Sequence, residues 1–453
     1  MSEEKRIIQK YMPTLCADTA ERYEIPANVF NSSIHRGLRN YDGTGVLVGA
    51  TRIGSVRGYY MEDGERVPMD GKLLFRGIRV TDLAENHWQS GTFGYEEVAY
   101  LLLLGKLPNR AQMELFTAML AEARPLPQGF FDDMILKNPS PNVMNGLARS
   151  ILALYTYDDD PDSRTVENLM SQSVSLIARL PVIVAQTYAV KRHVYNGKSL
   201  YIHHPKDGLS LAENFLRMIR KDKSYTPEEA KLLDLMLIIH AEHGGGNNSA
   251  FVCRALSSSG TDTYSAIAGA VGSLKGPLHG GANAKVMEMF RWLNENVSDR
   301  KDDDAIRVQL NRILAGEGGD GSGKIYGLGH AVYTMSDPRA VLIKKYARDM
   351  AESAGRLEEF EFMERVERLG VEILSAKKKD DFPMCANVDF YSGFVYSILR
   401  IPEELYTPLF AIARIAGWCA HRMEEVLTGG RIMRPAYRAV MPRLEYVPID
   451  ERE

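Results

Sequence analysis

Two glycine-rich stretches in the middle of the chain carry its most informative signal: HAEHGGGNNSA (residues 240–250) and AIAGAVGSLKGPLHGGAN (266–283). A third stretch, YGLGHAVY (326–333), repeats the pairing of histidine with glycine. Glycine is costly inside a helix because its backbone has more freedom to lose on folding. One such histidine would be an ordinary core residue. Three together favour loops in which the backbone approaches a ligand.

Outward from these loops the pattern is mostly helical. The clearest start signal is Thr226-Pro227-Glu228-Glu229, a capping box with proline in the first turn. Strand signals are confined to the first eighty or so residues, where GVLVGATRI (45–53) and GKLLFRGIRV (71–80) flank a turn-rich segment, which predicts a short hairpin or two. Further helices are predicted at 95–104, 110–124, 264–275, 283–297, 303–315, 338–353, 357–377 and 404–427.

The composition is that of an ordinary globular protein. The chain has 453 residues, 45% hydrophobic and 25% charged, which allows two or three domains. A net charge of −4 gives no long-range attraction for nucleic acid or an anionic membrane. The most apolar stretches, such as 101–104 and 235–239, look far too short to span a membrane.

The compartment is inferred from the cysteines and the N-terminus. The chain has four cysteines, and no two form a CxxC pair, which argues against a disulfide framework or a zinc knuckle. The first residues, MSEEKRIIQKYM, have neither the apolar run of a signal peptide nor the acid-poor composition of a transit peptide. These features predict a cytoplasmic protein.

Two other kinds of site compete with this interpretation. His240 and His243 lie three residues apart and could share a metal, but the spacing is not HExxH and no cysteine is near. GGDGSGK (318–324) fits the GxxxxGK of a nucleotide-binding loop, yet Ile325 stands where Ser or Thr should hold magnesium, and a helical pattern precedes it. Such a loop can still bind phosphate through its backbone amides and its lysine.

Arg339 and Asp389 are weaker signals when read alone. Arg339 follows Ser336-Asp337-Pro338, a helix start where a guanidinium would suit a carboxylate. Asp389 sits in a short stretch without helical periodicity, which is more typical of a turn or a cap than of a base.

Several motifs together resemble the citrate synthase family in their order along the chain, from about residue 70 to 440. They are LLFRGIRVTDLAE (73–85), EEVAYLLLLGKLP (96–108), the two opening stretches, YGLGHAVYTMSDPRA (326–340), NVDFYSG (387–393) and RIMRP (431–435). The resemblance implies a mainly α fold of two domains with the site in the cleft between them. A large dimer-forming domain would comprise residues 1–280 and 392–453, and a small, mobile, CoA-binding domain residues 281–391.

The resemblance also implies the site residues. The catalytic residues would be His279, His330 and Asp389. The oxaloacetate ligands would be His243, Asn247, Arg339, Arg414 and, reaching in from the partner subunit of a homodimer, Arg434. The CoA contacts would be Lys324, Tyr326, Gly327 and Gly329. His240 would lie near by. No metal or other cofactor is implied, since the CoA thioester is a substrate.

The implied activity is the condensation of acetyl-CoA with oxaloacetate, a step of the tricarboxylic acid cycle. Asp389 would remove a proton from the acetyl methyl group, His279 would donate to the thioester oxygen, and His330 would polarise the ketone. Three alternatives stay open on the sequence: a 2-methylcitrate synthase that uses propionyl-CoA, a citryl-CoA lyase, and a non-catalytic CoA-binding relative.

Overall fold

The computed structural model describes residues 12, 16, 22–31, 33–40, 43–377 and 382–452. Contacts divide the chain into two units, Met1–Gly49 with Arg434–Glu453, and Ala50–Met433. In the first unit two short 3-10 turns are described, η1 (Ala27–Val29) and η5 (Ile449–Glu451). The second unit contains the sheet and the helices described below.

The described strands of the second unit form one antiparallel sheet in the order β1 (Gly54–Glu62), β2 (Glu65–Phe75) and β3 (Ile78–Arg79). Asp63 and Gly64 join β1 to β2 with φ values of 50° and 85°, as a two-residue hairpin turn requires. The predicted hairpin is confirmed, but the strand predicted at 45–53 is wrong. The Asp-Gly turn sets Glu62 opposite Glu65, so the strand that pairs with β2 is the one directly before the turn.

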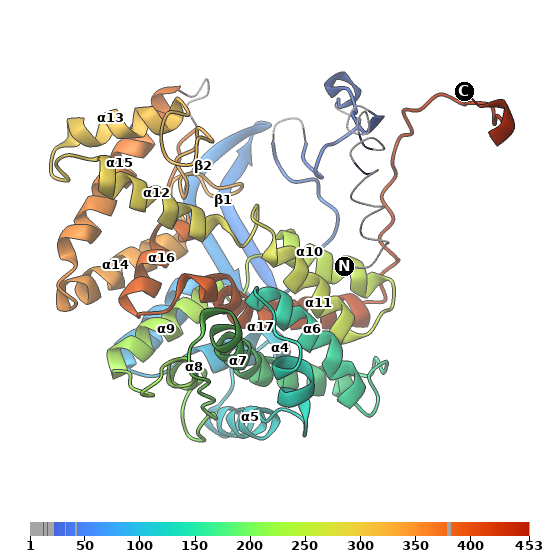
Figure 1. The fold of residues 1–453 in the computed structure, drawn as a ribbon, viewed down its shortest axis with the longest axis vertical. Helices are drawn as coiled ribbons and strands as arrows, with labels where there is room; N and C mark the ends of the chain where they lie inside the picture. Colours follow the sequence, from blue (N-terminus) through green and yellow to red (C-terminus); the bar gives the residue numbers. More distant parts are fainter. Residues whose placement is uncertain are drawn as a thin grey trace. The chain divides into compact units, whose positions relative to one another are not determined.

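The longest described helix, α7 (Val166–Asn196), was not singled out by the sequence pattern. It is long and apolar enough to cross a membrane, which corrects the expectation that the apolar stretches are all too short. However, 83% of its most apolar window is buried inside the protein, so α7 is a core helix. A helix covered on most faces shows no apolar stripe. It packs against α17 (Tyr406–Leu427), near the middle of Figure 1.

Most predicted helices are confirmed to within about two residues, because their caps are explicit in the sequence. Thr226 accepts a hydrogen bond from the Glu229 amide at the start of α9 (Pro227–His240), with Pro227 as the first residue. The other described α-helices are α3 (Val80–Ser90), α4 (Tyr95–Leu104), α5 (Arg110–Ala123), α6 (Val143–Leu154), α8 (Leu211–Ile219), α10 (Asn248–Ser258), α11 (Thr263–Lys275), α12 (Ala282–Asn296), α13 (Asp303–Leu314), α14 (Pro338–Ser353), α15 (Leu357–Lys377) and α16 (Val388–Ile398).

Helices α12 to α16 form a group within this unit. α12 and α14 pack on α16, while α13 and α14 pack on α15, and the group lies to one side of Figure 1 in yellow and orange. The predicted small domain, residues 281–391, stays a prediction, and its boundary at 391 falls inside α16. The fold is mainly helical with one small sheet near its N-terminal end, as the sequence predicted.

Candidate active site

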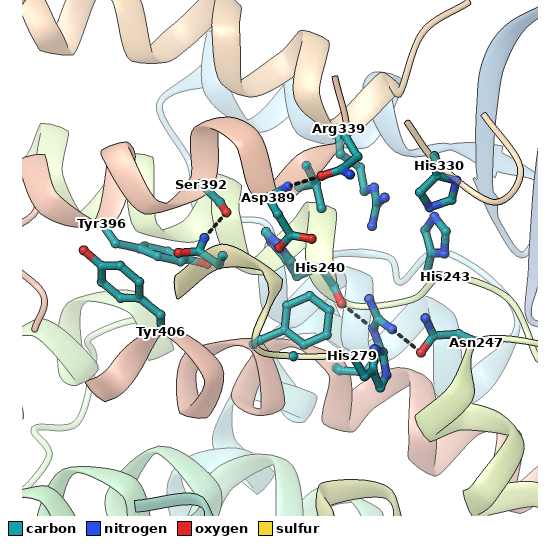
Figure 2. Close-up of a pocket in the computed structure, with 16 residues that line it drawn as sticks. His240, His243, Asn247, His279, His330, Arg339, Asp389, Ser392, Tyr396 and Tyr406 are labelled. Atoms are coloured by element: carbon teal, nitrogen blue, oxygen red, sulfur yellow. Dashed lines mark hydrogen bonds between the residues drawn. The ribbon is translucent and has the colours of Figure 1, made fainter. Parts of the chain in front are cut away.

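A cavity of about 130 Å³ lies where several helix ends converge in the second unit (Figure 2). All three predicted catalytic side chains line this cavity, as do most of the predicted oxaloacetate ligands. The lining residues are His240, His243, Asn247, His279, Gly280, Asn283, His330, Arg339, Asn387, Val388, Asp389, Ser392, Tyr396, Tyr406, Phe410 and Arg414.

Helix termini place the polar residues. His240 is the last residue of α9, and Asn247 is the N-cap of α10. Arg339 and Asp389 each occupy the second position of a helix, α14 and α16 respectively. The first turn of a helix carries unpaired amides and partial positive charge. Three positive helix ends therefore meet at the cavity, which suits an anionic ligand.

Asp389 lies in the first turn of α16, whose N-cap Asn387 accepts a hydrogen bond from the Asp389 amide at 3.0 Å. The sequence pattern placed Asp389 in a stretch without helical periodicity, and that prediction is wrong. Almost every side of α16 is buried, so the sequence shows no amphipathic period there. Burial raises the pKa of Asp389 to about 6, although Arg339 and Arg414 oppose the shift. The residue is thus a carboxylate at neutral pH with unusually high basicity.

His279 lies in the loop between α11 and α12 and is held by Ser249. The Ser249 amide donates to Nε2 at 3.3 Å, and the Ser249 hydroxyl lies 3.0 Å from the same atom. Because Nε2 accepts, the proton of the neutral ring is on Nδ1. Burial lowers the pKa of His279 to about 4, with Arg414 adding to the effect. His279 therefore offers the cavity a neutral N–H donor.

His330 has the opposite tautomer. Its Nδ1 accepts hydrogen bonds from the amides of Val332 and Tyr333, both at 3.1 Å, so Nε2 is the donor of the ring. The ring stacks on that of Tyr333, with centroids 4.6 Å apart, and meets the His243 ring edge to face at 5.2 Å. These contacts fix the direction in which His330 can donate.

Arg414 projects from the middle of α17 and is completely buried. Its Nε donates to the carbonyl of His240 at 2.6 Å, and its Nη1 donates to the Asn247 side chain at 3.1 Å (Figure 2). Its Nη2 and the Nε2 of His243 are buried without a hydrogen-bond partner among the described residues. Leaving buried polar atoms unpaired is costly, so these two atoms mark where the oxygens of a ligand would bind.

Arg339 is paired with a buried carboxylate in this structure. Asp337 accepts from its Nε at 3.0 Å and from its Nη2 at 2.7 Å. Burial would lower the pKa of Arg339, but Asp337 outweighs it and the pKa is raised. Burial, together with the charge of Arg339, lowers the pKa of His243 well below its usual value. His243 is therefore neutral beside two fixed cations, Arg339 and Arg414.

His240 is fully buried, and its tautomer is also fixed. Its Nδ1 donates to the carbonyl of Met236 at 2.7 Å, and burial lowers its pKa to about 3.

In the alternative interpretation of the sequence, His240 and His243 would together bind a metal ion. Within the part of the chain that the structure describes, no group of three or more His, Cys, Asp or Glu side chains could hold a metal ion.

Comparison with known proteins identifies the family. The family described as citrate synthase, C-terminal domain, matches residues 40–436. The chain belongs to the citrate synthase family. Citrate synthase of Synechocystis sp. is 36% identical over 391 residues, which cover 84% of this chain and 89% of that protein. The 2-methylcitrate synthase 1 of Corynebacterium glutamicum is 32% identical over 433 residues, covering 93% and 99%. The chain is thus an acyltransferase of this family.

Solved structures of the citrate synthase family have the same fold. That of citrate synthase from Pyrobaculum aerophilum aligns with a TM-score of 0.73 and 30% identity, covering 92% of this chain and 95% of that one. Citrate synthase from Thermoplasma acidophilum, solved in a ternary complex with carboxymethyl coenzyme A and oxaloacetate, aligns with a TM-score of 0.72 and 26% identity, covering 90% of this chain and 97% of that one.

The CoA contacts implied by the citrate synthase resemblance do not line the cavity. Lys324 and Tyr326 line a separate small pocket of about 10 Å³ beside α12 and α13. Gly327 and Gly329 have positive φ values of 83° and 85°, and the carbonyl of each accepts a hydrogen bond from Asn387. These glycines tie the His330 segment to the cap of the Asp389 helix. Their contact with CoA stays a prediction.

Arg434, the fifth predicted oxaloacetate ligand, belongs to the unit formed by Met1–Gly49 and Arg434–Glu453. Its side chain is exposed there. Its role in a citrate synthase site stays a prediction.

Sequence reasoning missed part of the cavity wall. Ser392 and Tyr396 follow Asp389 by three and seven residues on α16, and Phe410 precedes Arg414 by four on α17. These are the spacings of one helix face. A helix predicted at 388–398 would have placed Ser392 and Tyr396 on the same face as Asp389. Asn283 and Tyr406 carried no comparable signal.

Proposed function

We propose that this enzyme is a citrate synthase that condenses acetyl-CoA with oxaloacetate and water to give citrate and CoA. One observation carries the proposal: the buried carboxylate of Asp389 shares a cavity with two histidines whose tautomers are fixed, so that one offers Nδ1–H and the other Nε2–H. The relatives support the proposal, because several proteins at 32–36% identity to this chain are citrate synthases.

The first step is removal of a proton from the methyl group of acetyl-CoA. Asp389 accepts that proton, and its raised pKa makes it a stronger base than an ordinary carboxylate. Negative charge moves onto the thioester oxygen, which accepts a hydrogen bond from Nδ1 of His279. A preorganised donor of this kind is worth about 3 to 4 kcal/mol at the transition state.

The second step forms the carbon–carbon bond. The nucleophilic carbon attacks the ketone carbon of oxaloacetate while Nε2 of His330 transfers its proton to the ketone oxygen, which becomes the hydroxyl of citryl-CoA. Asp389 then releases the proton that it took in the first step and His330 regains one, so that both residues return to their starting states. Water then adds to the thioester carbonyl, the carbon–sulfur bond breaks, and CoA leaves as the free thiol. Arg414, Arg339, His243 and Asn247 hold the two carboxylates of oxaloacetate, with the unpaired atoms of His243 and Arg414 as two of the donors.

The second candidate differs only in the acyl group. Two relatives, at 32% and 34% identity, are 2-methylcitrate synthases, which supports propionyl-CoA as the alternative substrate. One methyl group changes the activation free energy by only about 1 to 3 kcal/mol. We expect kcat/KM to be higher with acetyl-CoA when both thioesters are compared at saturating oxaloacetate. A preference for propionyl-CoA of about tenfold or more, equal to ~1.4 kcal/mol, would reassign the enzyme as a 2-methylcitrate synthase.

The active form is proposed to be a cytoplasmic homodimer in which Arg434 of one subunit completes the oxaloacetate site of the other. The segment around Arg434 has exposed apolar side chains that suit burial against another chain, namely Ile432, Tyr437, Met441 and Leu444. Movement of residues 281–391 would close the cavity around the substrates and exclude water during condensation.

A further inference from the structure

A buried charged network lies behind the cavity, and the mechanism above does not use it. Glu242 and His421 are completely buried, with Oε1 and Nε2 2.9 Å apart. Neither residue lines the cavity. However, Glu242 directly precedes the ligand His243, and His421 lies two turns after Arg414 on α17.

The hydrogen bonds of this network lead from Arg254 through His421 to Glu242, each residue donating to the next. Nη1 of Arg254 lies 3.1 Å from Nδ1 of His421. Because a guanidinium can only donate, Nδ1 accepts, and the proton on Nε2 points at Glu242. Arg254 is itself held by Glu424 at 2.7 Å and by Glu425 at 2.9 Å. Helices α10 and α17 thus jointly direct one N–H donor at the Glu242 carboxylate.

The carboxylate of Glu242 folds back on its own loop. Its Oε1 accepts a hydrogen bond from the amide of Gly244, which has a positive φ of 82°. A β-carbon at Gly54 of β1 would lie 2.8 Å from Oε1, and one at Gly417 of α17 would lie 2.5 Å from Oε2. Glu242 is therefore packed on two sides with no room to move, and it fixes the turn that leads to Asn247.

Glu242 also balances the charge of the oxaloacetate site. Burial would raise the pKa of Glu242, but the interactions with His421 and Arg414 outweigh it, and the pKa is lowered. Burial lowers the pKa of Arg414 to about 10, and Glu242 opposes this shift. A buried charge without a counterion is strongly destabilising. Each of these two buried ions therefore helps to keep the other charged.

We propose that Glu242, held by His421 and Arg254, is a positioning residue that presets the loop Ala241–Asn247 for a dicarboxylate substrate. This inference rests on the proposed function, since that function makes His243 and Asn247 ligands of oxaloacetate. A loop fixed before binding has no ordering cost to meet when the substrate arrives. Loss of the His421 donor should therefore weaken oxaloacetate binding without changing the acyl-CoA side of the site.

Two substitutions at one position separate the two contacts of His421. In His421→Asn the shorter side chain can still accept from Arg254 but is too short to reach Glu242. In His421→Gln the amide can still donate to Glu242, and the contact with Arg254 is lost. Oxaloacetate binding to the full-length variants is measured by calorimetry, and the KM values for oxaloacetate and acetyl-CoA are measured alongside. Arg254→Lys is a milder second variant in case His421→Asn does not fold.

We expect His421→Asn to weaken oxaloacetate binding about tenfold, which is ~1.4 kcal/mol, while the KM for acetyl-CoA stays within about twofold. His421→Gln should bind oxaloacetate nearly as well as wild type. Arg254→Lys should weaken oxaloacetate binding, as His421→Asn does, but by a smaller factor. Equal effects of Asn and Gln, or equal increases in both KM values, would overturn the proposal. A wild-type enzyme that binds oxaloacetate but releases no CoA would instead contradict the proposed function, and the binding comparison would still decide the role of Glu242.

Discussion

Asp389 should set the acidic limit of activity. Burial raises its pKa to about 6 against the opposing charge of Arg339, and only the ionised form can accept a proton from the acyl group. Burial lowers the pKa values of His240 and His279 to about 3 and about 4, so neither ring titrates near neutrality. We expect kcat/KM for acetyl-CoA to rise about tenfold per pH unit up to pH ~6 and then to level off.

The profile is measured from about pH 5 to about pH 8 at saturating oxaloacetate, with unfolding monitored at each pH. The carboxyl loses its proton more readily as the pH rises, so activity must fall on the acidic side. A profile that is flat throughout this range would contradict the assignment of Asp389 as the base.

Single residues differ in how far the sequence alone could assign them. His279 and His330 stand out because glycine-rich loops are unusual around histidine. Asp389 does not stand out, since its helix is buried on almost every side and shows no period. The family resemblance supplied it. The tautomers of both histidines depend on backbone amides brought in by folding, such as that of Ser249 against His279, and no local sequence pattern contains that information.

At the scale of elements, the β1–β2 hairpin supports the segment that follows His330. The hydroxyl of Thr334 donates to the carbonyl of Gly58, and the amide of Gly71 donates to the carbonyl of Ser336 at 3.1 Å. A β-carbon at Gly58 would lie 2.3 Å from the carbonyl oxygen of Val332. We therefore expect Gly58→Ala to displace this segment, lowering kcat and reducing the free energy of unfolding by about 1 to 3 kcal/mol.

Urea unfolding and steady-state kinetics check this prediction. Gly49→Ala is the matched control, because a β-carbon there meets nothing within 4 Å and the backbone has no positive φ. The control should unfold and turn over like wild type. If the two alanine variants behaved alike, the hairpin would have no part in placing His330.

Elements with explicit caps were the most predictable. The start of α9 follows from Thr226, Pro227 and Glu229, all of which act as the sequence suggests. The elements that failed lack such local signals. The first strand is predicted at 45–53 but lies at 54–62, because the Asp63-Gly64 turn, inside a broad turn-rich segment, sets which residues pair. The sequence shows no signal for α7 because that helix is buried on nearly every side.

At the scale of the whole molecule, the proposed homodimer predicts complementation between two inactive variants. Asp389→Asn removes the base from a subunit's own site, and Arg434→Ala removes a ligand from the partner's site. Subunits of the two variants, unfolded and refolded together, should regain about a quarter of wild-type activity, since half of the dimers are mixed and each has one intact site. Each variant refolded alone is the control. No recovery in confirmed mixed dimers would place Arg434 in its own subunit's site or outside the site.

Oxaloacetate-dependent release of free CoA thiol from acetyl-CoA decides the chemistry most directly. Wild-type protein should release thiol only when oxaloacetate is present, with one citrate formed for each thiol. Asp389→Asn should fold and bind oxaloacetate but lose at least about a thousandfold in kcat, as expected when the proton acceptor of the first step is removed. Near-normal release by folded Asp389→Asn, or no release by folded wild type, would contradict the mechanism proposed for this cavity.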